Sequence, residues 1–189
     1  GDRGLSGNHV SHRFIWNSVY ELPYRGGSTV PRQILGGWTL GLIAELRTGP
    51  PYGVIENVNT TGTGSPALRP NVVGDPRISG DRSRGEQVER WFNTAAFAAP
   101  QPFTFGNAGR TSGYGPGAII MDLSVLKNFR LAERHSLEFR TEMLNFINRA
   151  NFALQAQNLA RGAPAFGRIS GLLPGNQSRI IQLGLHYRF

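Results

Sequence analysis

Three charged side chains recur at every second position in one part of the sequence: Glu138, Arg140 and Glu142. Successive side chains of a strand point to opposite faces, so an extended segment would place all three on one face. Two carboxylates on one face suggest acid/base catalysis, which requires an environment that separates their pKa values. No nucleophile, metal motif or apolar pocket is recognisable beside them. Cross-strand ion pairs, each contributing about 0.2–1 kcal/mol, are the simpler interpretation, with substrate contact as the alternative.

Other motifs with catalytic or metal-binding chemistry are weak or missing. The sequence has no cysteine, which excludes disulfides, thiolate metal sites and a thiol nucleophile. His9 and His12 have a spacing that could hold a metal, but no third ligand is near them in the sequence. The glycines at 113, 115 and 117 do not form a nucleotide loop, because Pro116 removes an amide donor and no buried strand precedes them. We therefore expect no enzymatic activity, no metal site and no cofactor.

Composition favours strands separated by turns. The 189 residues suit one domain, and only 39% are hydrophobic, while 25 are glycine and 12 are proline. The apolar runs fall far short of the roughly 20 residues that a membrane-spanning helix needs. A membrane barrel remains possible, because its strands alternate and score as only mildly hydrophobic.

The formal net charge is +8, yet the basic residues are scattered along the chain. An arginine-rich surface can bind phosphate-bearing partners. A nucleic-acid site requires a clustered basic footprint, which this sequence lacks. We therefore expect no nucleic-acid partner.

The clearest alternation of side chains runs from residue 178 to Phe189. The odd positions from 181 to 189 hold two leucines, an isoleucine and two aromatic residues, whereas the even positions hold Gln, Gly, His and Arg. An apolar face that ends in Tyr187 and Phe189 suits a strand whose outer face meets lipid and whose aromatic end lies at the membrane interface. The last strand of a soluble sandwich is the alternative.

The same alternation recurs along the chain and predicts an all-β fold, an antiparallel meander of about six strands. The strands are expected near residues 12–23, 38–47, 52–57, 119–131, 135–147 and 179–189, and the long loops at 58–117 and 148–178. Residues 48–51 (Thr-Gly-Pro-Pro) are expected to form a tight turn, and residues 151–160 could form a short helix. A long unstructured loop is unusual in a compact domain but normal outside a membrane barrel, where long loops lie on one side and short turns on the other.

Long and short connections alternate in this scheme, as a transmembrane β-barrel requires. We therefore interpret the chain as part of a larger barrel with long external loops and assign the side chains to its two faces. The predicted lipid-facing residues are Trp38, Leu40, Leu42, Leu137, Phe139, Leu183, Leu185, Tyr187 and Phe189. The predicted lumen-facing charged residues are Glu45, Arg47, Glu138, Arg140 and Glu142.

Several ordered motifs are found at residues 12–14, 20–23, 36–38, 48–52, 69–71, 91–97, 105–107, 115–117, 137–142, 146–148 and 151–152, followed by Phe189. These motifs resemble the C-terminal barrel of TonB-dependent outer-membrane receptors, in particular the Oar-like subgroup, whose members carry a carboxypeptidase-regulatory-like N-terminal domain. They cover nearly the whole chain. Members also contain a plug domain, a TonB-interacting segment and a barrel of 22 strands, which this chain cannot hold.

The resemblance implies a piece of a larger receptor in the bacterial outer membrane that takes part in energised passage of a ligand. The implied partners are outer-membrane lipid, the rest of the barrel and its plug, the TonB complex and an unidentified ligand. Candidate ligand contacts in the long loop are Trp91, Phe92, Phe97, Phe103 and Phe105. For the first three, anchoring of the loop onto the barrel is the preferred alternative. Two other functions stay open: a soluble β-rich module that binds a carbohydrate-like ligand, and a structural or adhesive barrel without transport.

Overall fold

The computed structural model describes residues 3–24, 33–64, 68–154 and 158–189. The chain divides into two compact units, and several segments contribute to each. We call Arg13–Leu46, Ile119–Ala150 and Gly175–Phe189 the strand unit, and Gly1–His12, Arg47–Ala118 and Asn151–Pro174 the loop unit.

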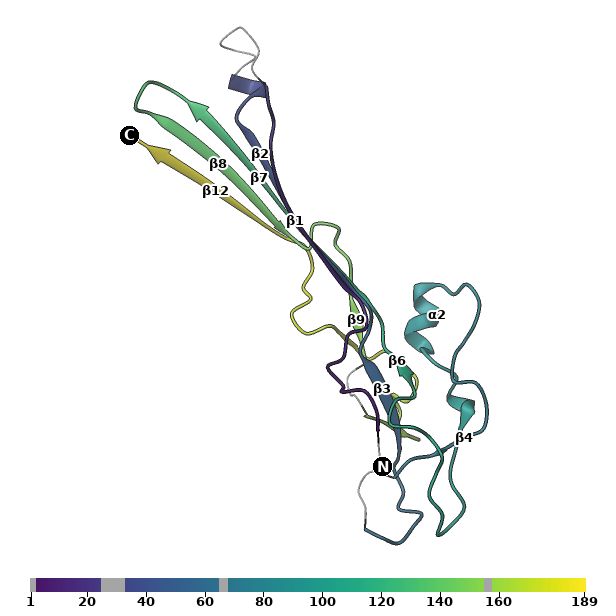
Figure 1. The fold of residues 1–189 in the computed structure, drawn as a ribbon. Coiled ribbons are helices and arrows are strands. Elements are labelled where there is room, and N and C mark those ends of the chain that lie inside the picture. Colours follow the sequence, from purple (N-terminus) through teal and green to yellow (C-terminus); the bar gives the residue numbers. More distant parts are fainter. Residues whose placement is uncertain (1–2, 25–32, 65–67, 155–157) are drawn as a thin grey trace. The chain divides into compact units, whose positions relative to one another are not determined.

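The strand unit is built on one sheet, which in the described residues has five strands in the order β1-β2-β7-β8-β12 (Figure 1). Their bounds are Arg13–Glu21 for β1, Trp38–Arg47 for β2, Ala118–Arg130 for β7, Ser136–Leu144 for β8 and Ile180–Arg188 for β12. Neighbours are antiparallel: β8 pairs with β7 and with β12 in this sense. The amide of Leu22, just after β1, donates to the carbonyl of Trp38 at the start of β2, and that of Asn128 near the end of β7 donates to Gly37, just before β2.

This topology separates the two kinds of connection. The link between β7 and β8 is a short turn, closed by a 2.9 Å hydrogen bond from the Leu131 amide to the His135 carbonyl. The chain from β2 to β7 and the chain from β8 to β12 are long and leave the opposite end of the sheet. Within the described residues the sheet does not close, since β1 and β12 each have a neighbour on one side only.

The structure corrects the position of the third expected strand. The segment near 52–57 does form a strand, β3 (Pro51–Glu56), but β3 pairs with β6 and β10 and has no place in the five-stranded sheet. Residues 48–51 therefore do not make a hairpin between sheet neighbours. Each proline drives the residue before it toward an extended conformation, so consecutive Pro50 and Pro51 carry the chain onward.

In the described residues of the loop unit, the strands form three small sheets (Figure 1). In the first, β3 lies between β10 (Asn158–Arg161), to which it is parallel, and β6 (Gly113–Tyr114), to which it is antiparallel. In the second and third, β9 (Phe152–Ala153) pairs with β11 (Gly171–Leu172), and β4 (Asn71–Val72) pairs with β5 (Phe97–Ala98). The short helix expected within residues 151–160 is wrong, because β9 and β10 occupy described parts of that range. Pairing with distant strands has overridden the local preference.

The described part of the loop unit also has two short helical segments. Helix α2 (Arg84–Glu89) begins with a capping box in which Ser83 and Glu86 bond each other's backbone amides. The 3₁₀ helix η1 (Thr94–Ala96) is capped by the Asn93 side chain. In the described part of the chain, no helix has the length and apolar character to cross a membrane.

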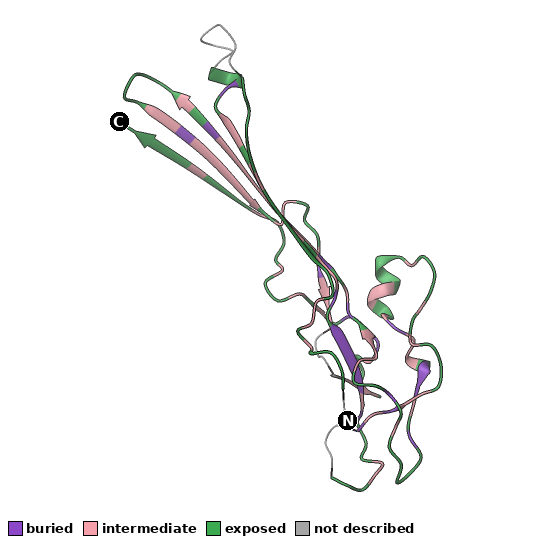
Figure 2. Ribbon diagram, viewed as in Figure 1, coloured by how far each residue is buried: buried purple, intermediate pink, exposed green. Residues whose placement is uncertain are grey.

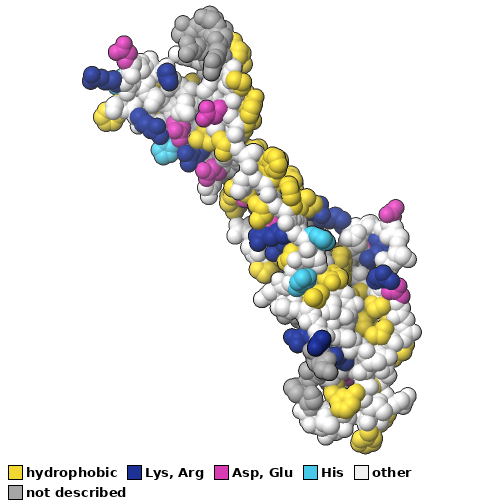
Figure 3. All heavy atoms as spheres, viewed as in Figure 1, with side chains coloured by type: hydrophobic (Ala, Val, Ile, Leu, Met, Phe, Trp, Pro, Cys, Tyr) yellow, Lys and Arg dark blue, Asp and Glu magenta, His cyan; other side chains and the backbone are white. Residues whose placement is uncertain are grey.

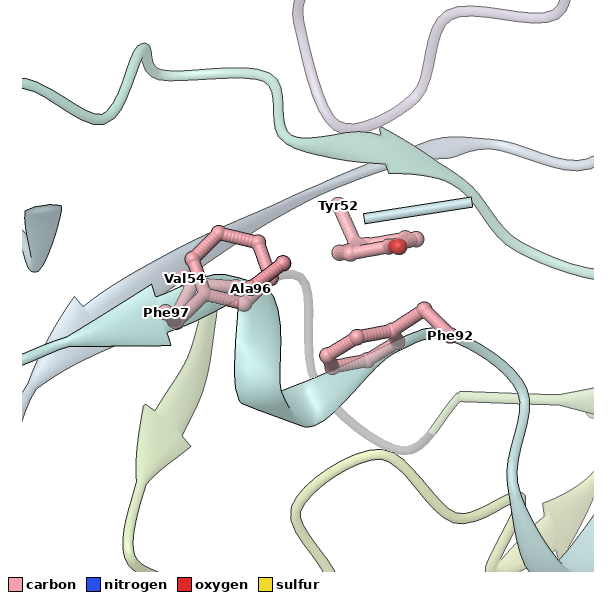
Figure 4. Close-up of a cluster of buried hydrophobic side chains, with 5 residues drawn as sticks. All are labelled: Tyr52, Val54, Phe92, Ala96 and Phe97. Atoms are coloured by element: carbon pink, nitrogen blue, oxygen red, sulfur yellow. The ribbon is translucent and has the colours of Figure 1, made fainter. Parts of the chain in front are cut away.

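The buried core lies in the loop unit, whereas the five-stranded sheet is mostly exposed or half-buried (Figure 2). Five buried residues from β3 and from the 92–97 segment pack together: Tyr52, Val54, Phe92, Ala96 and Phe97 (Figure 4). The rings of Tyr52 and Phe92 stack with centroids 5.0 Å apart, and Phe166 meets Phe92 edge-on at 5.2 Å. The long connections thus fold around an aromatic core of their own.

Candidate functional site

One face of the five-stranded sheet carries a row of ion pairs. Glu138 accepts from Arg140 of the same strand at 3.4 Å and from Arg188 of the neighbouring β12 at 3.3 Å. Arg140 also reaches Glu142 at 3.4 Å. The Glu138 side chain is only 10% exposed, while that of Arg140 is 44% exposed and that of Arg188 is 71% exposed. Figure 3 shows charged side chains of both signs side by side near the C-terminal end.

The row extends across the sheet to β1 and β2. Glu45 accepts two hydrogen bonds of 3.0 Å from the guanidinium of Arg13. Gly41 and Glu45 share a face by alternation, and Gly41 stands against Ser124, which is the register partner of Glu142. Glu45, Glu138, Arg140 and Glu142 therefore occupy one face of one sheet. The fifth predicted member, Arg47, ends β2 and belongs to the loop unit.

The opposite face of the sheet is apolar. The register places Tyr187 beside Leu137 and Leu185 beside Phe139. The same face carries Trp38, Leu40 and Leu42. The rings of Trp38 and Phe129 both lie against the ammonium of Lys127, which places Trp38 on the side of Phe129. Leu40 and Leu42 follow Trp38 by alternation. Exposure on β12 is high, at 70% for Leu183 and 66% for Leu185, and 91% for the adjoining Phe189. No described segment covers these side chains, so the face requires an apolar surrounding.

Sequence reasoning missed Lys127 on the apolar face. It has the same parity as Val125 and Phe129, which would have revealed its position. Its ammonium lies 5.2 Å from the ring centroid of Trp38 and 4.9 Å from that of Phe129, and it donates to the carbonyl of Gly36. The residue is 1% exposed. Two aromatic faces and one acceptor thus compensate a cation near the strand end.

The five aromatic residues proposed as ligand contacts divide into two groups. Phe92 is 2% exposed and Phe97 is 5% exposed, which places both in the core of the loop unit. Trp91 packs against this core, and its indole N–H donates to the Tyr114 carbonyl at 2.9 Å. For these three, the interpretation as loop anchors agrees with the packing, although the core they support is that of the loop unit. Of the five, Phe103 and Phe105 are the two whose rings are largely exposed.

Phe103 and Phe105 are 84% and 72% exposed. Their loop is held in place, since the amide of Phe103 donates to the Thr60 carbonyl at 2.6 Å. Phe103 has a positive φ of 62°, a conformation unusual for a bulky side chain. Next to them, Gly106 touches the backbone of residues 69 and 70 so closely that any side chain there would collide. The structure thus presents two phenyl rings on a constrained backbone.

The described residues contain no group of three His, Asp or Glu side chains arranged to hold a metal ion. His9 lies 3.4 Å from the hydroxyl of Ser11, and His12 bonds Thr48 through its backbone. His9 therefore bonds through its ring and His12 through its backbone, each to a different residue.

The sheet has an uncovered apolar face, ion pairs on the other face and long connections at one end. These features define a strand segment of a membrane β-barrel. The family comparison identifies the same class: residues 1–182 match the family model described as "Outer membrane beta barrel domain". The chain belongs to this family, and its place is the bacterial outer membrane. Comparisons with curated proteins and with solved structures gave no match.

Family membership confirms the all-β fold and the outer-membrane location predicted from the alternation of side chains. It also favours the membrane barrel over a soluble binding module. Contact with membrane lipid follows from that location.

Proposed function

We propose that this chain forms part of a TonB-dependent receptor barrel of the Oar-like kind, which passes a ligand across the outer membrane with energy from the inner membrane. The observation that carries the proposal is the loop unit. Two long connections leave the same end of the sheet, and their segments fold around an aromatic core while Phe103 and Phe105 stay exposed. A barrel that only spans the membrane needs no such body.

In this proposal the two sheet faces have different roles. The apolar face contacts lipid, and the face with Glu138 and Arg140 lines the lumen, where paired charges are compatible with water. Phe103 and Phe105 contact the ligand, since exposed aromatic rings bury a large area at little loss of conformational entropy. The plug and the TonB contact belong to other parts of the protein. No catalytic step and no cofactor are assigned to this chain.

A structural or adhesive barrel without transport is the second candidate, because it would use the same sheet. The full-length gene product, expressed in a Gram-negative host, distinguishes the two. Mass spectrometry of the medium would identify compounds that cells remove only when they contain both the protein and an intact TonB system. The double variant Phe103→Ser, Phe105→Ser should abolish removal, whereas the matched control Val73→Ser, at an exposed position of the same unit, should not.

Removal that persists without TonB would contradict energised transport and indicate a passive channel. Absence of any compound removed by cells carrying the protein would favour the structural barrel. Equal effects of the double variant and of Val73→Ser would refute the role assigned to the two phenyl rings.

A further inference from the structure

The exposed ring of Phe103 lies beside a turn at residues 59–63. The amide of Phe103 donates to the carbonyl of Thr60 at 2.6 Å. A methyl group at Gly62 would come within 4.0 Å of the Phe103 ring, so the turn passes next to that ring. We call Phe103, Phe105 and this turn the phenyl site. Its two segments are about forty residues apart in the sequence, yet the fold places them together.

The turn offers neutral hydrogen-bonding groups on a fixed backbone. The side-chain oxygen of Asn59 accepts from the amides of Thr61 and Gly62 at 3.1 and 3.0 Å and from the Thr61 hydroxyl at 3.2 Å. The hydroxyls of Thr61 and Thr63 lie 2.7 Å apart and share a hydrogen bond. These bonds use the oxygen of the Asn59 amide, so its nitrogen remains a donor, and the Thr63 oxygen remains an acceptor.

No charged side chain belongs to the phenyl site. Residues 57–64 and 91–109 contain no Asp, Glu, Lys, Arg or His. Arg69, whose backbone lies against Gly106, donates through its guanidinium to the Ala108 carbonyl at 3.4 Å. A charged ligand would therefore find no counter-ion in either segment of the site. The site is suited to a neutral ligand.

Apolar rings beside neutral donors and acceptors match the chemistry of a sugar. A pyranose ring with equatorial hydroxyls has axial C–H bonds on both faces, and the negative face of a phenyl ring attracts their partial positive charge. The hydroxyls at the rim of the sugar both donate and accept hydrogen bonds, as the groups of the turn do. The constrained backbone of the site reduces the entropy that binding would otherwise cost.

We propose that the phenyl site binds a neutral β-linked oligosaccharide, which stacks on Phe103 and Phe105 and forms hydrogen bonds with the turn at residues 59–63. This assignment of a ligand class rests on the proposed function, in which the two rings contact the ligand. A neutral peptide could also lie against two phenyl rings, but it would need an apolar surface alone and not an aromatic face.

The binding test uses three neutral tetrasaccharides: cellotetraose, laminaritetraose and chitotetraose. The full-length gene product in lipid nanodiscs would be titrated with each one by saturation-transfer NMR, and empty nanodiscs would give the background. We expect at least one of them to bind, with the strongest saturation on the axial C–H protons of the sugar rings. A capped Ala-Leu-Ala-Leu peptide is the competing probe.

Substitutions of Phe105 separate stacking from simple apolar contact. Phe105→Tyr keeps an aromatic face and should change the affinity for the oligosaccharide by less than about twofold. Phe105→Leu keeps an apolar side chain without that face, so it should weaken oligosaccharide binding by at least about fivefold and leave peptide binding unchanged. Tyr114→Leu is the matched control, because this ring of the loop unit is 48% exposed and belongs to neither segment of the site.

Asn59→Asp tests the polar part of the site. The substitution keeps a side-chain oxygen for the amides of the turn, but it replaces the NH₂ donor with a charged acceptor. It should therefore weaken oligosaccharide binding by at least about fivefold while the circular dichroism spectrum stays that of the unmodified protein.

Three results would overturn the proposal: no binding of any of the three oligosaccharides, equal affinity in a folded Phe105→Leu variant, or binding of the peptide alone. None of them affects energised transport, because TonB-dependent removal of another compound would still support the proposed function. Conversely, oligosaccharide binding at this site by a barrel that removes nothing with TonB would refute transport and keep the site.

Discussion

The assignment of the apolar face to lipid can be tested on β12 with two neighbouring residues that point to opposite faces. Leu183→Arg puts a charge on the apolar face, whereas Gln182→Arg puts the same charge on the face of the ion pairs. β12 has nine residues, close to the length that crosses a membrane, and Leu183 lies beside its centre at Gly184. A charge on the lipid face near the membrane midplane destabilises a barrel by about 2–4 kcal/mol. We expect that loss for Leu183→Arg and little change for Gln182→Arg.

Depth along the strand distinguishes lipid from a protein core. Tyr187 lies four positions beyond Leu183, which is about 14 Å along the strand at about 3.4 Å per residue. With a strand tilt of about 40°, this amounts to a difference in depth of about 10 Å, which places residue 187 at the membrane interface. A charge there should destabilise by only about 0–1 kcal/mol. Because Tyr187 also stacks on His135 and Phe189, the comparison is between Tyr187→Arg and Tyr187→Leu.

Denaturant unfolding of the full-length protein in lipid vesicles, followed by tryptophan fluorescence, gives the free energy of unfolding for each variant. Three results would refute the lipid assignment. One is an equal loss for Leu183→Arg and Gln182→Arg. Another is a loss at residue 187 as large as at residue 183, which a buried protein core would produce. The last is that Leu183→Arg lowers the free energy of unfolding by the same amount when the protein is folded in plain buffer without lipid.

Three further predictions concern the loop unit. Gly49→Ala should lower the free energy of unfolding by about 1–3 kcal/mol in a denaturant titration, because the added methyl group collides with the Gly115 carbonyl; an unchanged midpoint would contradict this. Burial raises the pKa of Tyr52, so its phenol should stay protonated in the folded protein when free tyrosines ionise near pH 10. Its contribution to stability is therefore complete below pH 10 and is lost as the pH rises further. An ultraviolet titration, compared with that of Tyr52→Phe, would show whether this phenol ionises at a higher pH than free tyrosine. Glu56→Gln should destabilise the pairing of β3 with β10. The buried Glu56 carboxylate accepts hydrogen bonds of 2.7 and 3.2 Å from Arg161, and the substitution leaves this arginine without its carboxylate. Hydrogen exchange in β10 should become faster, and exchange equal to that of the unmodified protein would refute the prediction.

The strands of the sheet were predictable because their pattern is local and complete. β2 has the predicted bounds, and β12 begins within one residue of the prediction. The division of their side chains between two faces depends only on odd and even positions. For the same reason Lys127 was recoverable, since its position in the alternation places it with Val125 and Phe129.

The loop unit was not predictable in this way. β4, β5, β9 and β11 have two residues each, too few to show a period. β3 pairs with β10 about a hundred residues further along the chain, so no local signal marks the contact. The aromatic candidates illustrate the limit, because Phe92 and Phe103 are the same residue type in the same long connection, yet one is buried and the other exposed.

The two unpaired margins of the five-stranded sheet constrain how the protein reaches its membrane. Along the outer sides of β1 and β12, the amide and carbonyl groups that point away from the sheet have no strand beside them among the described residues. In hydrocarbon each such group would be unfavourable by several kcal/mol, because no water is available to replace the missing strand. These five strands therefore cannot enter the bilayer ahead of the rest. The chain must meet its neighbouring strands first or insert together with them, so that ring closure and membrane entry become one coupled step in its biogenesis.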